Sequence, residues 1–305
     1  MNEFQFYGKI ILQVRRILMI LVIAFFTGRN NILSAQSERS DIPILLTCRW
    51  LDENISDKNI TVLHISTIRR YFDDGHIPGA RYLWPGRIIL STEMETMVPP
   101  EMKKAEKVLE DLGITGESHI VLCGTDNLFT VARIFVTLSH FGLETRLSIL
   151  QGGFDEWKGS GRKVSTDNAE FKKGRLKLIR QDNLVNSDWM IRNIENKDYC
   201  IIDARPEVYY NGSQVSAFTK RNGHIPGAKS VPMSGLYNGM FFSEEKITEA
   251  FRNLGISHDV RPVFYCFVGS YASIDYVAAL VAGYRPLLYD GSMEEWGNRP
   301  ELPVE

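Results

Sequence analysis

The chain contains two copies of one sequence pattern. The segment DGHIPGARYL at 74–83 returns as NGHIPGAKSV at 222–231, and LQGGFDEWKGSGR at 150–162 returns as YDGSMEEWGNRPE at 289–301. The matching segments keep the same order and nearly the same spacing, as expected for a structural unit that is used twice. The repeat therefore predicts two similar domains of about 125 residues each, which also suits the length of the chain.

Each copy alternates short apolar runs with stretches of helical composition. ITVLHIS (60–66) and SHIVLCG (118–124) in the first copy correspond to YCIIDAR (199–205) and RPVFYCF (261–267) in the second. Short, continuous apolar runs between helices are typical of parallel strands that are buried on both faces. We therefore predict an α/β fold of two tandem domains, each a small, mostly parallel β-sheet with helices on both faces.

A polar, charged stretch at 163–178 separates the two copies and has no amphipathic period. Such composition between two patterned regions indicates a linker. We place the first domain at 41–165, the linker at 166–178 and the second domain at 179–305.

The first 35 residues differ in kind from the rest. Basic residues precede an apolar run at 17–26, and a polar stretch then ends in small residues at Ala35. This order predicts a secretory signal over 1–35. A retained membrane anchor is the alternative, but the run is about half of the roughly 20 residues that a span requires. We expect an exported, periplasmic protein with no stable membrane insertion after cleavage.

Charge and cysteine content narrow the possible partners. The net charge of −2 provides no overall basic field for nucleic acid, so we expect none as a partner, and we predict no cofactor and no metal. An even number of cysteines in an exported protein allows two disulfides. Wide, irregular spacing and apolar surroundings favour free thiols instead, at positions Cys48, Cys123, Cys200 and Cys266.

Cys266 stands where the apolar run at 261–265 ends and a helical stretch begins near Ala272. Unpaired backbone N–H groups and the positive end of the helix dipole favour an anion there. A thiolate in such a place has a lowered pKa and is the reactive form. Gly269 lets the loop curl so that N–H groups point inward. The residues alone leave two alternatives open, a nucleophile and a buried core thiol.

The motifs together resemble the tandem-domain rhodanese family, sulfurtransferases of the thiosulfate/mercaptopyruvate type. They are GHIPGA twice, DAR at 203–205, C-x-x-G-x-x-A-S at 266–273 and the closing segment at 289–305. The resemblance implies that the first domain is non-catalytic and that Cys266 is the catalytic residue of the second. It also implies that the loop after Cys266 binds substrate through Phe267, Val268, Gly269, Ser270 and Tyr271.

The chemistry implied by the resemblance is covalent sulfur transfer. Cys266 would take a sulfane sulfur from a small donor, thiosulfate or mercaptopyruvate, and hold it as a persulfide. A thiol, cyanide or a similar acceptor would then remove that sulfur, while loop N–H groups stabilise the anionic sulfur. Outside the cytosol a thiol reductant protein is an expected further partner, because glutathione and thioredoxin are not reliably available there.

Two positions depart from the family pattern. Family members that prefer thiosulfate often have a basic residue directly after the cysteine, where this chain has Phe267. A substrate-contacting arginine a few residues after the D-A-R motif is replaced by Tyr209. We therefore expect backbone N–H groups to hold an anionic donor, with Arg205 or Arg221 as side-chain contacts. For Arg205 the alternative is a structural ion pair.

The first copy departs further from the family pattern at the place that corresponds to the Cys266 loop. Cys123 lies near the position of Cys266, and the loop after it is expected to be about two residues longer. His64 stands where the family usually has aspartate. His76 and His224 occur once in each copy, which favours structural hydrogen bonding over acid–base chemistry.

Two other kinds of function compete with sulfur transfer. A non-catalytic rhodanese-like module that binds a sulfur compound or a protein is the main alternative, because the loop is apolar. A cysteine phosphatase needs an arginine six residues after the cysteine, where this chain has Ala272.

Overall fold

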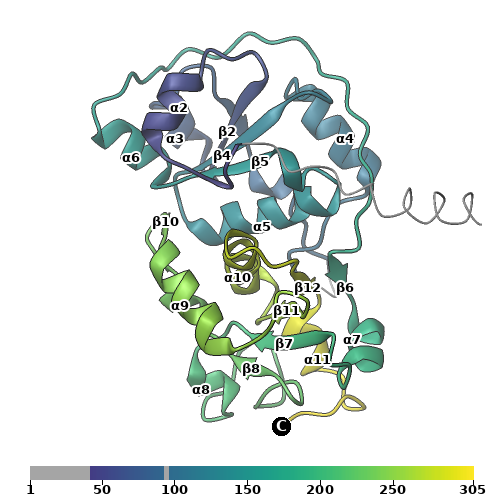
Figure 1. Cartoon of the computed structure of the whole chain (residues 1–305). Helices are drawn as coiled ribbons and strands as arrows, with labels where there is room; N and C mark the ends of the chain where they lie inside the picture. The colour runs from purple at the N-terminus through teal and green to yellow at the C-terminus, as the bar shows by residue number, and fades with distance from the viewer. Residues whose placement is uncertain (1–41, 93–95) are drawn as a thin grey trace, which may run out of the picture. The chain divides into compact units, whose positions relative to one another are not determined.

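Each copy of the repeat folds into its own five-stranded parallel sheet. The structure, a computed structural model, describes residues 42–92 and 96–305 (Figure 1). The predicted secretory signal at 1–35 lies outside the described residues. Every pair of neighbouring strands within the two large sheets runs parallel. The predicted α/β fold of two tandem domains is confirmed.

The two sheets have corresponding strand orders. The first is β1-β5-β4-β2-β3, formed by Leu45–Leu46, Leu147–Leu150, His119–Gly124, Ile60–Ile65 and Arg81–Leu83. The second is β6-β12-β11-β7-β8, formed by Leu184–Val185, Leu287–Tyr289, Arg261–Tyr265, Tyr199–Asp203 and Lys229–Ser230. The long apolar runs of the sequence thus become the central strands β4 and β11.

Helices follow the strands in both domains. The first domain contains α2 (Cys48–Asn54), α3 (Arg69–Asp73), η1 (Pro85–Arg87), α4 (Met102–Asp111), α5 (Leu128–His140), η2 (Glu144–Arg146) and α6 (Gly153–Gly159). The second contains α7 (Ser187–Asn193), α8 (Glu207–Tyr210), η3 (Met233–Gly235), α9 (Glu244–Leu254), α10 (Ser270–Val281) and α11 (Ser292–Trp296). A small antiparallel pair, β9 (Tyr237–Asn238) and β10 (Phe241–Phe242), joins η3 to α9.

Helices cover both faces of the first sheet because successive strand residues point to opposite faces. On one face Val121 packs with Leu51 of α2 and Trp157 of α6. On the other face Leu122 packs with Leu109 of α4 and with α5. The second sheet repeats this plan, with α7 and α11 on one face and α9 and α10 on the other.

The two domains share one apolar core through a pair of helices. α5 packs against α10, and a single cluster of buried residues continues from the first sheet to the second (Figure 1). This contact places the start of α5 beside the start of α10, where Phe129 and Tyr271 meet with ring centroids 5.0 Å apart. Among the described residues, the helices are all too short or too polar to cross a membrane.

Candidate active site

Cys266 occupies the turn between the central strand β11 and helix α10. The strand ends at Tyr265 and the helix begins at Ser270, so the cysteine lies at the carboxyl edge of the sheet. Gly269 caps the helix with φ +84°, a left-handed conformation that favours glycine. The strand-to-helix turn predicted from the sequence is present.

Backbone N–H groups surround the sulfur. Gly269 N donates to Cys266 Sγ at 3.1 Å. Hydrogen bonds from the backbone of Val268, Tyr271 and Ala272 also favour the anionic form of the sulfur. The loop therefore forms a nest of donors, which suits a thiolate or the terminal sulfur of a persulfide.

The thiol is nevertheless not acidic in this resting structure. Cys266 is fully buried, and desolvation raises the pKa of its thiol above the ordinary value, outweighing the hydrogen bonds that lower it. The sequence predicted a lowered pKa. The N–H groups do lower the pKa of this thiol, but the larger effect of burial makes the overall prediction wrong. The thiol must therefore lose a proton before it can act as a nucleophile.

The turn before α11 holds the backbone of the cysteine. Cys266 N donates to Ser292 Oγ at 3.2 Å, and Met293 N donates to the Cys266 carbonyl at 3.0 Å. Glu294 N donates to the Phe267 carbonyl at 2.9 Å. Ser292 adopts φ +49°, unusual for a residue other than glycine, and is fully buried. Sequence reasoning did not identify this support, although the repeated Trp-bearing turn marks its place.

Aromatic side chains pack around Phe267 of the loop. The ring of Phe267 meets Tyr209 at 4.8 Å, Tyr271 at 5.6 Å and Phe218 at 5.9 Å between centroids. Phe218 is 45% exposed, so this aromatic cluster continues to the surface. Phe267 and Tyr209, which stand where the family has basic residues, thus both belong to this aromatic cluster.

Arg205 is buried and paired. Its Nε and Nη2 donate to both carboxylate oxygens of Asp203 at 2.6–3.1 Å, and Nη2 also donates to the Gly223 carbonyl at 2.8 Å. Its guanidinium carbon lies 5.6 Å from the centroid of the Phe267 ring. The structure thus brings Arg205 to the loop as an ion pair with Asp203 that engages Nε and Nη2.

Arg221 lies with the C-terminal segment. Its guanidinium donates to the carbonyls of Trp296, Gly297, Arg299 and Leu302 at 2.6–3.2 Å. These bonds use Nε and both terminal nitrogens to hold the end of the chain. The contact between Arg221 and substrate stays a prediction that rests on the sequence alone.

The repeated histidines bond to backbone. His76 Nδ1 lies 2.8 Å from the Phe72 carbonyl, and His224 Nδ1 lies 2.9 Å from the Tyr210 carbonyl. Each ring also stacks on the neighbouring aromatic ring, with centroids 3.8 and 3.9 Å apart. Equivalent contacts in both domains agree with a structural role.

Arg133 is a charged residue near the loop that sequence reasoning missed. It lies on α5 of the first domain, is fully buried, and donates through Nη2 to Asp290 Oδ1 at 2.5 Å and to the Met97 carbonyl. Its Nη1 lies 3.0 Å from the place that a Cβ on Gly269 would occupy. The available signal was a lone arginine inside the otherwise apolar stretch LFTVARIFV.

Strand register corrects the comparison of the two loops. Cys123 pairs with His64 across β4 and β2, as Tyr265 pairs with Asp203 across β11 and β7. Because His64 takes the place of Asp203 in the repeat, Cys123 corresponds to Tyr265, and the next residue, Gly124, corresponds to Cys266.

The two loops therefore have the same length. The helix caps Asn127 and Gly269 each stand three residues beyond Gly124 and Cys266. The expectation of a longer first loop is wrong, because it was counted from Cys123. That cysteine is fully buried within β4, and desolvation raises the pKa of its thiol strongly.

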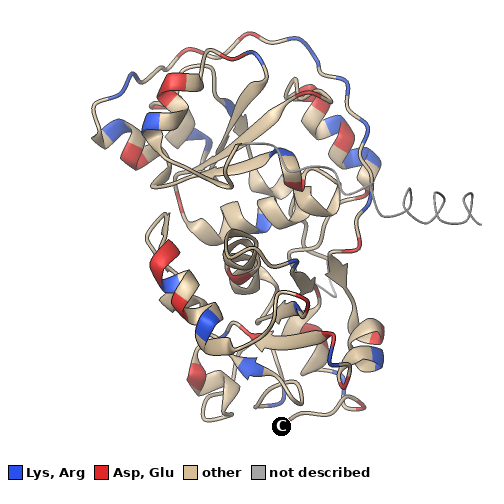
Figure 2. Ribbon diagram, in the orientation of Figure 1, with Lys and Arg blue, Asp and Glu red and all other residues tan. Residues whose placement is uncertain are grey.

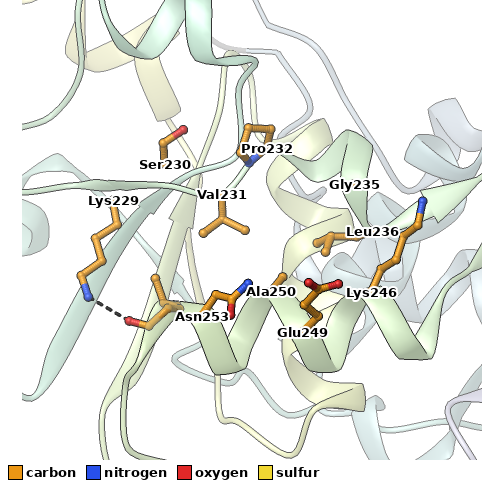
Figure 3. A pocket seen from close by; sticks show the side chains of 11 residues that line it. Lys229, Ser230, Val231, Pro232, Gly235, Leu236, Lys246, Glu249, Ala250 and Asn253 are labelled. Atoms are coloured by element: carbon orange, nitrogen blue, oxygen red, sulfur yellow. Dashed lines mark hydrogen bonds between the residues drawn. The ribbon is translucent and has the colours of Figure 1, made fainter.

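A separate groove lies away from Cys266. It has a volume of about 600 Å³ between η3 and α9, where Lys229, Leu236 and Glu249 are among its lining residues (Figure 3). No residue of the Cys266 loop lines it.

All four cysteines are free. Within residues 42–92 and 96–305, His, Cys, Asp and Glu side chains form no group of three or more that could hold a metal ion.

Comparison with known proteins identifies the family. The model of the rhodanese-like domain matches residues 47–160 and again 186–299, which together make up more than half of the chain. The chain belongs to the rhodanese family. Two relatives of this rhodanese that match over most of its length are named sulfurtransferases, and its enzyme type is sulfurtransferase.

Three matches indicate the breadth of the likeness. The sulfur carrier protein TtuD of Thermus thermophilus is 28% identical over 86% of this chain and 96% of its own. The thiosulfate sulfurtransferase of Azotobacter vinelandii is 27% identical over 87% of this chain and 98% of its own. The solved structure of SseA, a 3-mercaptopyruvate sulfotransferase of Escherichia coli, has a TM-score of 0.72 at 24% identity, covering 82% and 99% of the two chains.

Proposed function

We propose that this rhodanese moves a sulfane sulfur from thiosulfate or mercaptopyruvate to a thiol, cyanide or a similar acceptor through a persulfide on Cys266. The observation that carries the proposal is the nest of four backbone N–H groups around Cys266 Sγ. Such a nest stabilises an anionic sulfur in both half-reactions without a cationic side chain in the loop.

With thiosulfate the first half-reaction breaks one S–S bond and forms another. The Cys266 thiol loses its proton to solvent, and its thiolate attacks the outer sulfur of the donor. The electron pair of the donor S–S bond leaves with sulfite, and Cys266 becomes a persulfide. An acceptor thiolate then attacks the outer sulfur of that persulfide, which returns the Cys266 thiolate and releases the acceptor persulfide.

The aromatic cluster around Phe267 provides no charged side chain that would select between the two donors. Thiosulfate is a dianion, and mercaptopyruvate combines a carboxylate with a small carbon chain. Phe267 and Tyr209 supply no positive charge, and Arg205 is neutralised by Asp203. Backbone N–H groups are thus the main donors for either anion.

Intact mass spectrometry tests the proposal directly. The reduced protein, incubated with either donor and freed of excess reagent, is expected to gain the mass of one sulfur, and Cys266→Ser is expected to gain none. Turnover with cyanide should fall at least about a thousandfold in Cys266→Ser, because the covalent step is lost. Absence of the added sulfur with both donors, on protein whose thiols are shown to be reduced, would leave a binding module as the better description.

A further inference from the structure

The first domain brings a buried positive charge to the Cys266 loop. Arg133 lies on α5 and is fully buried. Its Nη1 would lie 3.0 Å from a Cβ on Gly269, and the Asp290 carbonyl would lie 3.4 Å from the same point. Gly269 is the residue whose N–H donates to Cys266 Sγ. Only the width of one residue therefore separates the guanidinium from the loop's interior.

The guanidinium is only partly satisfied. Nη2 donates to Asp290 and to the Met97 carbonyl, but Nε and Nη1 have no hydrogen-bond partner among the residues that the structure describes. Burying such donors without partners is costly. α5 is otherwise free of Lys and Arg, as its single blue segment shows (Figure 2). A buried guanidinium with two of its three nitrogens unpartnered among the described residues points to a role beyond packing.

The other charged groups near Cys266 have partners too. Asp203, the last residue of β7, pairs with Arg205, and Glu294 of α11 accepts from N and Oγ1 of Thr96. Burial raises the pKa of Asp275 on α10 and that of the Tyr265 phenol at the end of β11 well above their usual values, which favours the uncharged form of each. Arg133 and Asp290 form a further ion pair beside the loop. Substituting one member at a time removes either the positive or the negative charge.

We propose that Arg133 is a positioning residue whose charge, delivered from the first domain and set against Asp290, stabilises the anionic forms of the Cys266 sulfur. The inference rests on the proposed persulfide chemistry of Cys266. A positive guanidinium behind the loop favours the thiolate, and the Asp290 carboxylate opposes it. In this arrangement the first domain, which contributes no nucleophile, tunes the reactivity of the second.

Titration of the Cys266 thiolate provides the test. Its ultraviolet absorbance is taken as the difference between each full-length variant and the same variant carrying Cys266→Ser. Arg133→Met leaves Asp290 unopposed and should move the midpoint upward by about one pH unit. Asp290→Asn leaves Arg133 unopposed and should move it downward by a similar amount. Arg133→Lys, which keeps the charge, should restore most of the upward shift.

The opposite signs separate electrostatics from structure. Both variants break the same ion pair, so a merely structural role predicts shifts in the same direction, and that result would overturn the proposal. Tyr276→Phe is the matched control, because it removes the hydrogen bonds of the Tyr276 hydroxyl with Glu144 and Asn183, at 2.9 and 3.0 Å, without changing charge at the loop. Its midpoint should stay unchanged.

Separate measurements distinguish a folding defect, the role of Arg133 and the proposed function. If Arg133→Met does not fold, as judged by circular dichroism, Asp290→Asn carries the test, and an unchanged or upward midpoint in that variant refutes the proposal. The titration needs no sulfur donor. Failure of the parent protein to form a persulfide would therefore refute the proposed function while leaving the role of Arg133 measurable.

Discussion

The two domains share a scaffold and differ in what occupies the turn after the central strand. In the second domain Cys266 stands there, and backbone N–H groups point at its sulfur. In the first domain Gly124 takes that place, and the loop carboxylate of Asp126 accepts hydrogen bonds from Thr67 N at 2.8 Å and from the hydroxyls of Ser66 and Thr67. The second turn surrounds the thiol of Cys266, whereas the first is held by hydrogen bonds to the carboxylate of Asp126.

A segment of the second domain also packs on the first turn. A Cβ on Gly124 would lie 2.6 Å from the terminal methyl carbon of Met240 and 2.5 Å from a methyl of Val131. Gly152 N donates to the Met240 carbonyl at 3.1 Å, and Gln151 exchanges hydrogen bonds with Phe242. A side chain at position 124 would therefore require Met240 and Val131 to move, and the absence of catalysis in the first domain stays a prediction.

The helices after the two turns carry a basic and an acidic residue at equivalent places. Counting from the caps Asn127 and Gly269, Arg133 of α5 corresponds to Asp275 of α10. Arg133 extends to the Cys266 loop, while Asp275 is buried with both carboxylate oxygens unpartnered among the described residues. The same position of the repeated scaffold thus holds residues of opposite chemical type in the two domains.

The largest expected effect concerns the protonation of Cys266. Because burial raises the pKa of this thiol above its ordinary value of 9.0, the thiolate fraction should rise about tenfold per pH unit between about pH 7 and 8. The single-turnover rate of persulfide formation should rise in parallel. Stopped reactions analysed by intact mass measure it, and a rate that is already constant above about pH 6 would contradict a raised pKa.

A second test asks whether the first domain takes part in the chemistry. Cys123→Ser should leave turnover per folded molecule within about twofold, since Cys123 corresponds to Tyr265 and not to the nucleophile. It should lower the free energy of unfolding by about 1–3 kcal/mol, because a hydroxyl replaces a thiol inside an apolar core. Denaturant titration and steady-state kinetics measure the two effects. A large loss of turnover in folded protein would reassign the first domain.

The smallest expected effect concerns Asp275. Burial raises the pKa of its carboxyl well above the ordinary value of 3.8, so its favourable contribution to stability is present at low pH and is lost as pH rises above that value. Asp275→Asn should therefore raise the melting temperature by a few degrees at pH 7 and leave it nearly unchanged near pH 4.

Asp259→Asn, on the surface of the same domain, is the control for that comparison and should shift neither melting temperature. If Asp275→Asn lowers the melting temperature at pH 7, the carboxylate has a stabilising partner and the assignment of a neutral Asp275 is wrong.

The sequence by itself determined the duplication, the α/β architecture and the strand-to-helix turn that carries Cys266. These features depend on local patterns, namely apolar runs of strand length, glycine at the helix cap, and motifs repeated in order. Local pattern was insufficient where register mattered. A shift of one residue exchanged Cys123 for Gly124 as the counterpart of Cys266, and strand pairing in three dimensions corrected it.

Tertiary structure alone decided the electrostatics of the site. Full burial, which the sequence does not encode locally, raises the thiol pKa where the helix N-terminus alone would lower it. The pairing of Arg205 with Asp203 neutralises a predicted cation. Arg133 of the first domain, itself paired with Asp290, lies on the other side of Gly269. Such effects depend on distance and desolvation, and packing α5 against α10 creates both.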